Sequence, residues 1–403
     1  MLMHGTAPPS ITPLLESILL DIAGIDRPDA GSAGIRKLAE GVRLLSEAYR
    51  SSSGAAVKRL FEKERLLRSY VLYYLPVNLV KLYPVLDELV RSEGVFPPPG
   101  DSLAVLDLGC GPGTFLLGVM EYLASRRQQL GRLPRTLTLC GVDRASENIS
   151  TAETVIRAYL AASPVFRDRD VRAVFRHGVL QGPGLRGTGI PADEQFNIII
   201  AGNVLTELSP KGTRLSEAAI YRHLAPGGAL VLVDPGTRSS WKKLIVLRDL
   251  ILQKTPLNLY APCPRPGACP VRETGWCHEK VFWTPTAAVT AIDAHTGFTK
   301  TKGLKFSYFT FLRNRACLAD TYSAARHNDI WRAVSYLICN KGEDRLLVCN
   351  GTRRVLLRRL VRNASEKNAD FTAARRGDKI LFSGAEPRKQ LLDLGRQSIF
   401  RIL

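Results

Sequence analysis

The first hundred residues follow a helical pattern of apolar and polar positions. In residues 35–50 and 70–94, apolar side chains recur every three or four positions, which indicates amphipathic helices. Prolines and a glycine between Pro97 and Gly100 end this pattern, because proline lacks the backbone N–H that a helix needs. The pattern predicts an N-terminal helical region over residues 1–100.

From residue 101 onwards, short apolar runs alternate with amphipathic stretches. Strands are predicted for residues 103–109, 136–143, 196–205 and 227–236, and helices for residues 115–129, 147–162 and 241–253. Such alternation is typical of parallel strands joined by crossover helices. We therefore expect residues 101–330 to form an α/β domain on a doubly wound, Rossmann-like sheet.

Two further features follow the helix at 241–253. Residues 261–283 contain three cysteines and are predicted to be an insertion after the fifth strand of the sheet, before a strand pair around 304–314. Residues 331–403 contain short apolar runs at 335–340, 345–351 and 354–363, which predict a small β-rich C-terminal region.

The net charge of the chain indicates which kind of molecule it binds. The 403 residues contain 56 Lys and Arg against 37 Asp and Glu, a formal net charge of +19. Residues 351–403 alone have thirteen Lys or Arg and five Asp or Glu. An uneven excess of this kind favours RNA or DNA as partner, through phosphate contacts and counterion release. A basic composition that serves only solubility is the alternative.

No membrane or secretory segment is expected. No apolar run approaches the roughly 20 residues needed to span a bilayer. The first residues have no basic stretch before their apolar part and include Glu16 and Asp21, so they match neither a signal peptide nor an Arg-rich transit peptide. We expect the bacterial cytoplasm, with the mitochondrial matrix as the alternative, and a monomer when the protein is free.

A glycine-rich loop links the first predicted strand to its helix. It reads DLGCGPGTF and places Asp107 two residues before Gly109, with Gly111 and Gly113 at alternate positions. Alternating glycines let a backbone pass against a ligand, and ligands of open parallel sheets bind beyond the carboxyl ends of the strands. The spacing differs from dinucleotide and phosphate loops. It resembles motif I of class I S-adenosylmethionine-dependent methyltransferases, with Cys110 among the residues at the cofactor.

Polar residues at other strand ends extend this site. Asp143 ends the second strand, where it is expected to bind the ribose hydroxyls of the cofactor rather than only to cap the next helix. Asn203 lies at the end of the fourth strand of the sheet and either lines the cofactor pocket or caps the helix that follows, and Glu207 is expected to lie towards the same pocket. The Asn/Asp-Pro-Pro-aromatic motif of amino-methyltransferases is replaced by Ala201-Gly202-Asn203-Val204, so no catalytic residue is predicted.

The insertion suggests metal chemistry. Cys263, Cys269 and Cys277 are separated by five and seven residues, without the tight C-x₂₋₄-C pairs of structural zinc sites. Wide spacing and Cys-Pro steps favour an iron–sulfur cluster, which needs four thiolates. Cys349 is the best fourth ligand, with His278 as a weaker choice, and zinc remains the alternative metal.

Several stretches together resemble a known family. YLPVNLVKLYPVL, LDLGCGPGT, GNVLTEL, LVLVDPGT, APCPRPGACP, GWCHE and KFSYFTFLR occur in this order between about residues 60 and 380. They are similar to the methyltransferase-like protein of the mitochondrial small ribosomal subunit and its bacterial homologues. The cysteine segment is the most specific part of this resemblance.

The resemblance implies a cofactor, a cluster and a partner. It implies S-adenosylmethionine in the glycine loop and a [4Fe–4S] cluster on Cys263, Cys269, Cys277 and Cys349. It also implies association with small-subunit rRNA and proteins during subunit assembly, with or without methylation of the rRNA. Candidate phosphate contacts lie in the basic tail: Arg353, Arg354, Arg358, Arg359 and Arg362. The other candidate functions are an active RNA methyltransferase independent of assembly, and a zinc-stabilised RNA-binding module with a degenerate pocket.

Overall fold

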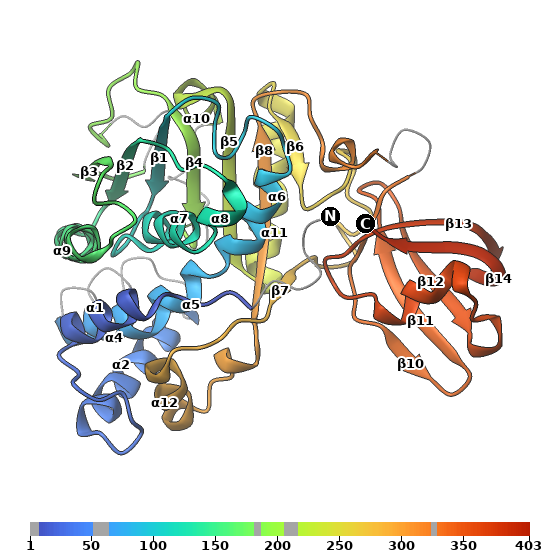
Figure 1. Ribbon diagram of the computed structural model, residues 1–403, viewed down its shortest axis with the longest axis horizontal. Coiled ribbons are helices and arrows are strands. Elements are labelled where there is room, and N and C mark those ends of the chain that lie inside the picture. The colour runs from blue at the N-terminus through green and yellow to red at the C-terminus, as the bar shows by residue number, and fades with distance from the viewer. Residues whose placement is uncertain (1–7, 51–63, 181–186, 205–216, 324–328) are drawn as a thin grey trace. The chain divides into compact units, whose positions relative to one another are not determined.

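The computed structural model describes residues 8–50, 64–180, 187–204, 217–323 and 329–403 (Figure 1). The chain forms two compact units. Unit 1 comprises residues 1–234 and 281–305, and unit 2 comprises residues 235–280 and 306–403. The domain boundaries at residues 100 and 330 that the sequence suggests differ from this division and stay a prediction.

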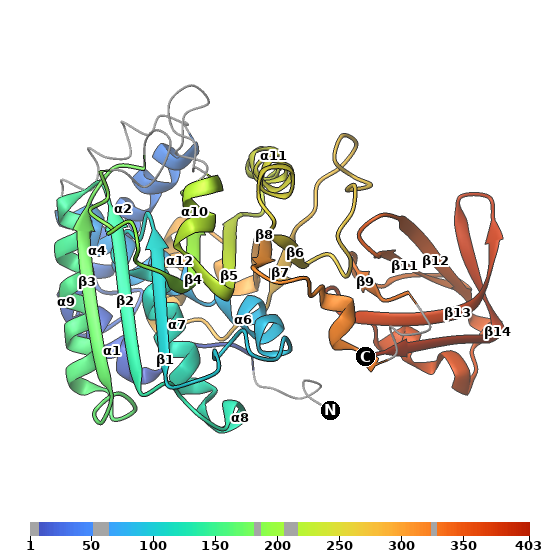
Figure 2. The same cartoon turned by 90° about the horizontal axis from the view of Figure 1, so that it is seen from above.

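Unit 1 is built on parallel strands. Its strands are β1 (Ser102–Leu108), β2 (Thr136–Asp143), β3 (Asp170–His177), β4 (Phe196–Gly202) and β5 (Leu224–Pro235). They lie in the order β3-β2-β1-β4-β5, and every neighbouring pair is parallel. Figure 2 shows β3, β2 and β1 side by side. The order reverses between β1 and β4, which is the position where doubly wound sheets bind ligands.

Helices cover this sheet and form the N-terminal region. They are α1 (Pro13–Ala23), α2 (Ala33–Arg50), α4 (Glu64–Ser69), the π-helical turn η1 (Tyr70–Tyr74), α5 (Leu75–Leu79), α6 (Leu82–Val90), α7 (Thr114–Ser125), α8 (Arg127–Leu130), α9 (Ser146–Ala162), α10 (Glu217–His223), α12 (Ala287–Thr296) and the 3₁₀ turn η2 (Lys300–Lys302). Among the described residues, no helix is long and apolar enough to cross a membrane.

Buried polar contacts attach the N-terminal helices to the sheet domain. Thr12, the N-cap of α1, donates its backbone N–H and its hydroxyl to the Glu121 carboxylate of α7, at 2.7 and 2.8 Å. The Tyr73 hydroxyl donates to Asp293 of α12 at 2.5 Å. A buried carboxylate needs such donors, because an unpaired one would lose its hydration without compensation. These contacts hold the N-terminal helices against α7 and α12 within unit 1.

Unit 2 begins with α11 (Arg238–Lys254) and then β6 (Asn258–Ala261). The cysteine segment follows β6 and leads to β7 (Glu279–Val281), and β8 (Leu304–Leu312) runs antiparallel to β6. The insertion therefore follows a sixth strand, one later than expected. The reason is that β6 has only four residues beside prolines, which is too short for an apolar pattern to indicate.

The rest of unit 2 is a six-stranded sheet with a helical segment. The strands are β9 (Trp331–Ala333), β10 (Ile338–Asn340), β11 (Glu343–Cys349), β12 (Arg354–Leu360), β13 (Lys379–Arg388) and β14 (Leu391–Ile402). The 3₁₀ segments are η3 (Leu318–Thr321), η5 (Val361–Asn363) and η6 (Glu366–Ala373). Its core contains Leu346, Leu357, Phe371 and Phe400, all fully buried. The predicted fold class is confirmed: an α/β unit with a doubly wound sheet, N-terminal helices and a β-rich C-terminal region.

Candidate functional site

The glycine loop lies at the carboxyl end of β1 and is held to the end of β2. The backbone N–H groups of Gly109 and Cys110 both donate to the Val142 carbonyl, at 2.8 and 3.0 Å. Gly109 has φ +77°, and a Cβ there would lie 2.8 Å from Cγ2 of Val204, so only glycine fits. The loop is therefore in contact with the segment that follows β4.

Gly111 and Gly113 serve different purposes. Gly113 has φ +80°, and a Cβ there would lie 3.3 Å from Ala152 and Ile156 of α9, so its role is close packing. Gly111 has φ +53°, and a Cβ there would meet no atom of the described structure within 4 Å. Its α-carbon thus borders open space, which is where a ligand can approach the backbone of the loop.

Asp107 has a fully buried carboxyl group and is the second-last residue of β1, just before this loop. Neither of its oxygens accepts a hydrogen bond of good geometry within the described residues. Burial raises the pKa of Asp107 well above its ordinary value and the Asp143 carboxylate raises it further, while the nearby backbone N–H of Phe115 opposes this. Because buried polar groups are normally hydrogen-bonded, the Asp107 carboxyl group could accept a hydrogen bond from a donor group of a bound ligand.

Asp143 connects the loop to the second strand. Its Oδ2 accepts the backbone N–H of Gly111 at 2.9 Å, and its Oδ1 accepts the N–H of Ala145 and the amide of Asn148, at 2.9 and 3.1 Å. The carboxylate therefore orders both the glycine loop and the start of α9. Contact with ribose hydroxyls stays a prediction.

The remaining predicted pocket residues lie beside the loop. Cys110 is buried, its thiol approaches the Gly111 carbonyl at 3.4 Å, and burial raises the pKa of Cys110. Asn203 has a left-handed backbone with φ +59°, and its N–H donates to the Val233 carbonyl at 2.8 Å. The structure thus brings together Asp107, the three glycines, Cys110, Asp143 and Asn203. Glu207 lies outside the described residues.

The four predicted cluster cysteines lie in one neighbourhood of unit 2. Burial raises the pKa of Cys263, and the thiols of Cys277, Cys349 and Cys269 raise it further. Burial and two of these thiols, those of Cys349 and Cys269, likewise raise the pKa of Cys277 to about 11. One thiol raises the pKa of another only when the two lie close together. Cys263 and Cys349 are therefore neighbours in space, although they are 86 positions apart along the chain.

The loop reaches Cys349 by close backbone contact with the turn between β11 and β12. The N–H of Arg265 donates to the Asn350 carbonyl at 3.3 Å. A Cβ on Gly351 would lie 2.1 Å from the Arg265 carbonyl oxygen, and one on Gly267 would lie 2.3 Å from Thr352. Both glycines therefore allow an approach that no other residue permits.

Cations surround these thiols. Arg248 lowers the pKa of Cys263, and Arg332 and Arg354 lower those of Cys277 and Cys349, because a positive charge favours the thiolate form. Four thiols among arginines fit the donor chemistry of a four-thiolate cluster. Within the described residues, however, no three His, Cys, Asp or Glu side chains are arranged to hold a metal ion. The cluster and its ligands stay a prediction.

The five arginines of the basic tail occupy different environments. Arg353 and Arg362 are exposed, whereas Arg354 is partly buried beside the cysteines. Arg358 pairs with Asp393 at 2.6 Å and with Glu343 at 3.4 Å. Arg359 is buried and contacts Asp344 at 3.3 Å and Asn368 at 3.0 Å. RNA contact by these residues stays a prediction.

Sequence reasoning missed a hollow beside the cysteine segment. A small hollow open to solvent, with a volume of about 20 Å³ for the centres of water molecules, is lined by residues that include Trp241, Cys277, His278, Arg332 and Arg376. Its residues come from α11, the cysteine segment, β8 and the C-terminal sheet. No sequence pattern indicates such a set, because only the fold brings these segments together.

Family comparison decides where the chain belongs. A family model described as mitochondrial small ribosomal subunit Rsm22 matches residues 66–378, which include the glycine loop, all three cysteines of the segment and Cys349. The chain belongs to the Rsm22 family. None of the curated protein sequences compared with it matches.

Solved structures show distant similarity. An arsenic(III) S-adenosylmethionine methyltransferase from Chlamydomonas reinhardtii is 18% identical with TM-score 0.31, and the match covers 54% of this chain and 66% of that one. The plantazolicin methyltransferase BamL, solved with SAH, is 12% identical with TM-score 0.35, covering 70% and 98%. YcgJ of Bacillus is 13% identical with TM-score 0.32, covering 57% and 98%. At these scores the fold assignment rests on the strand order of unit 1.

Proposed function

We propose that this Rsm22-family protein binds S-adenosylmethionine, carries a [4Fe–4S] cluster and contacts rRNA of the small ribosomal subunit during subunit assembly. The observation that carries this proposal is the match to a small-subunit family over residues 66–378. That range includes both the glycine loop and the four cysteines, so both features lie within the part of the chain that matches the family.

The glycine loop supports the cofactor. Gly111 borders open space, and Asp107 is buried without a well-aligned donor at the position where parallel sheets bind ligands. In the proposed complex the methionine part of the cofactor passes Gly111, and Asp143 faces the ribose. The four cysteines supply the thiolates for the cluster, and the nearby arginines offset the charge of those thiolates.

The cofactor is tested by calorimetric titration of the purified chain with S-adenosylmethionine and S-adenosylhomocysteine. Gly111→Ala introduces a methyl group on the ligand side of the loop, so we expect its affinity to fall at least about tenfold. Gly131→Ala is the control, because Gly131 also has positive φ, +68°, with no atom within 4 Å, but lies away from the loop. Absence of binding by the unmodified chain would remove the cofactor from the proposal.

The ribosomal part is tested by co-sedimentation with small and large ribosomal subunits. We expect the protein to migrate with the small subunit and not with the large one. An assay with labelled methyl groups and small-subunit rRNA then separates a binding role from an active methyltransferase. Migration with neither subunit would contradict the ribosomal assignment.

A further inference from the structure

The C-terminal sheet of unit 2 closes on itself. β9 pairs with β11 and with β13, β11 with β12, β12 with β14, and β14 with β13. Only the β12–β14 pair is parallel. These five strands form a closed barrel, with β10 extending the connection between β9 and β11.

This connectivity is that of the OB-fold, a five-stranded Greek-key barrel. Strand order β9, β11, β12, β13, β14 corresponds to its first to fifth strands, and η6 lies between the third and fourth. Phe371 of η6 is fully buried, and its ring contacts Phe400 at 5.0 Å between centroids, so η6 packs against the barrel core. OB-folds bind oligonucleotides or oligosaccharides on their second and third strands, between the first and fourth loops.

Fold alone does not establish a ligand, so the argument depends on the surface at that position. Side chains of directly paired residues point to the same side of a sheet. Ile338 of β10 pairs with Arg345 of β11, Arg345 pairs with Arg358 of β12, and Arg358 pairs with Asp393 of β14. Arg388 of β13 contacts Asp393 at 3.5 Å. We call the surface formed by Ile338, Arg345, Arg358 and Arg388 the barrel face. Tyr336 lies two positions before Ile338, in the segment that leads into β10.

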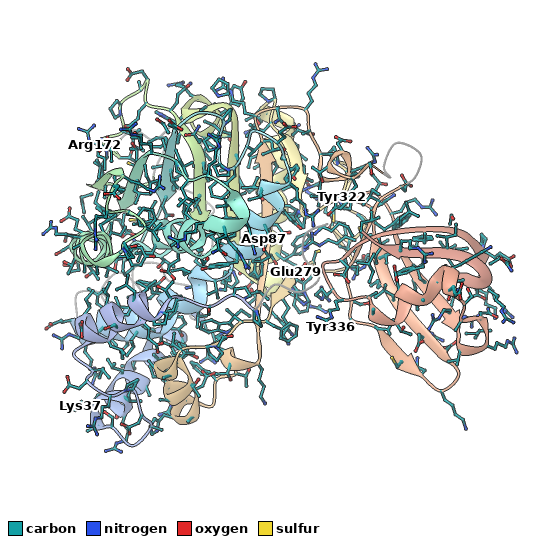
Figure 3. All side chains as sticks on the ribbon, in the orientation of Figure 1. Lys37, Asp87, Arg172, Glu279, Tyr322 and Tyr336 are labelled. Atoms are coloured by element: carbon teal, nitrogen blue, oxygen red, sulfur yellow. The ribbon has the colours of Figure 1, made fainter. Side chains whose placement is uncertain are left out.

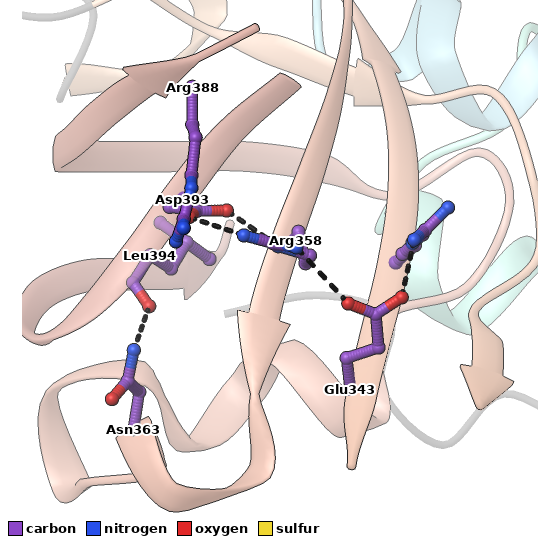
Figure 4. Close-up of polar contacts among 7 residues, drawn as sticks. Glu343, Arg358, Asn363, Arg388, Asp393 and Leu394 are labelled. Carbon is purple, nitrogen blue, oxygen red and sulfur yellow. Dashed lines mark hydrogen bonds and ion pairs between the residues drawn. The ribbon is translucent and has the colours of Figure 1, made fainter. Parts of the chain in front are cut away.

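Ion pairs hold the arginines of the barrel face in place. Glu343 contacts Arg345 at 2.5 Å and Arg358 at 3.4 Å, and Asp393 contacts Arg358 at 2.6 Å and Arg388 at 3.5 Å (Figure 4). Three cations share two carboxylates, so the network has a surplus of positive charge. The side chains of Arg345 and Arg388 are 37% and 67% exposed and can reach phosphates.

Tyr336, just before β10, is an exposed aromatic residue with cations of its own. It is 43% exposed, and it is labelled in Figure 3. The Arg376 guanidinium lies 5.6 Å and the Lys280 ammonium 5.8 Å from the centre of its ring. Arg376 also lines the hollow described above. Proteins that bind single-stranded nucleic acids combine exposed aromatic rings, on which bases stack, with nearby cations that contact the phosphates.

We propose that the C-terminal barrel binds single-stranded RNA across β11 and β12, with a base stacked on Tyr336 and phosphates on Arg345, Arg388 and Lys389. This inference deepens the proposed function and rests on it for the choice of RNA. Charge favours a polyanion over an oligosaccharide, because residues 331–403 contain sixteen Lys or Arg and seven Asp or Glu. The turn at Lys389, which has φ +56°, corresponds to the fourth OB loop.

The experiment measures fluorescence anisotropy of the full chain with a labelled single strand of about 12 nucleotides, within the range that one OB-fold covers. The same strand annealed to its complement and a neutral oligosaccharide are the competing ligands. Tyr336→Ala should weaken single-strand binding about tenfold, whereas Tyr336→Phe should stay within about twofold, because stacking needs the ring and not the hydroxyl. Tyr49→Ala, at an exposed tyrosine of unit 1 that is 37% exposed, is the matched control.

Arg388→Ala combined with Lys389→Ala should weaken binding at low salt and reduce the salt dependence, because fewer counterions are released. Equal melting temperatures confirm that each variant is folded. Three results would overturn the inference: unchanged affinity of Tyr336→Ala, equal loss in Tyr49→Ala, or a preference for duplex or oligosaccharide. The proposed function is tested separately, by the cofactor titration and the co-sedimentation with ribosomal subunits. None of these three results would change the outcome of those two measurements.

Discussion

Arg332 and Glu279 form an ion pair with 2.5 Å between Nη2 and Oε2, and their side chains are only 7% and 9% exposed. The pair joins β9 to β7, at the end of the cysteine segment, and Arg332 also reaches the Pro262 carbonyl at 3.4 Å. One buried pair thus holds both ends of the segment against the barrel.

Breaking this pair should destabilise the protein strongly. Glu279→Gln leaves Arg332 buried without its counter-charge, and the free energy of unfolding should fall by about 3–5 kcal/mol. Arg68→Met is the control, since its pair with Glu64 is exposed and should change stability by about 1 kcal/mol or less. Urea unfolding measures both variants. Equal effects would show that the buried pair has no special role.

Gly351→Ala should disturb the contact between the cysteine segment and the β11–β12 turn. A methyl group there meets the Arg265 carbonyl oxygen at 2.1 Å, so the segment must move. Gly342→Ala is a matched control, because Gly342 also has positive φ, +84°, but no atom within 4 Å. The control should lose about 1 kcal/mol from backbone strain alone. We expect Gly351→Ala to lose several times more stability and to bind less iron after anaerobic purification.

Cys269→Ser should remove the cluster and lower the melting temperature, because the free energy of metal binding contributes to folding. Cys339→Ser is the control, since Cys339 is exposed on β10 and is not among the predicted ligands. Iron and sulfide analysis with an absorbance spectrum measures the outcome. Full iron content in Cys269→Ser would refute the ligand assignment, and one zinc per chain without colour would favour the zinc alternative.

Lys81 makes stability depend on pH. It is buried between α5 and α6, with its ammonium 2.6 Å from the Asn78 side chain, and burial lowers the pKa of Lys81 to about 7, with Lys300 adding to this and Asp234 opposing it. Between pH 7 and the ordinary lysine pKa, the unfolded chain holds a proton that the folded chain has released, so stability rises with pH.

Lys81→Met should abolish this rise. Relative to the variant, the free energy of unfolding of the unmodified chain should increase by about 2 kcal/mol from pH 7 to pH 9. Lys37→Met, at an exposed lysine of α2 labelled in Figure 3, should leave the pH dependence unchanged. Parallel pH profiles of Lys81→Met and the unmodified chain would show that Lys81 is not the titrating group.

Local sequence patterns were sufficient for the parts of the fold that depend on local physics. The predicted strand 136–143 has the bounds of β2, and the helix predicted for 147–162 differs from α9 by one residue. Buried parallel strands are runs of apolar residues, and the glycine loop needs positive φ at fixed spacing, so both are visible along the chain. Motif spacing likewise located the loop that borders open space at Gly111.

Only the tertiary structure decided the features that depend on pairing between distant segments. β3 is a sheet-edge strand in which half of the residues are polar. The long strands β13 and β14 combine short apolar stretches with glycine, proline and charged residues, so neither a long apolar run nor a regular alternation marks them. Arg359 has the same residue type as its neighbour Arg358, yet it points inward to Asp344, because successive residues of a strand face opposite sides. Closure of the barrel through β9, and the approach of Cys349 to the cysteine segment, arise from backbone pairing over many residues. Such pairing depends on the whole chain, which is why composition and spacing could suggest these residues but could not place them together.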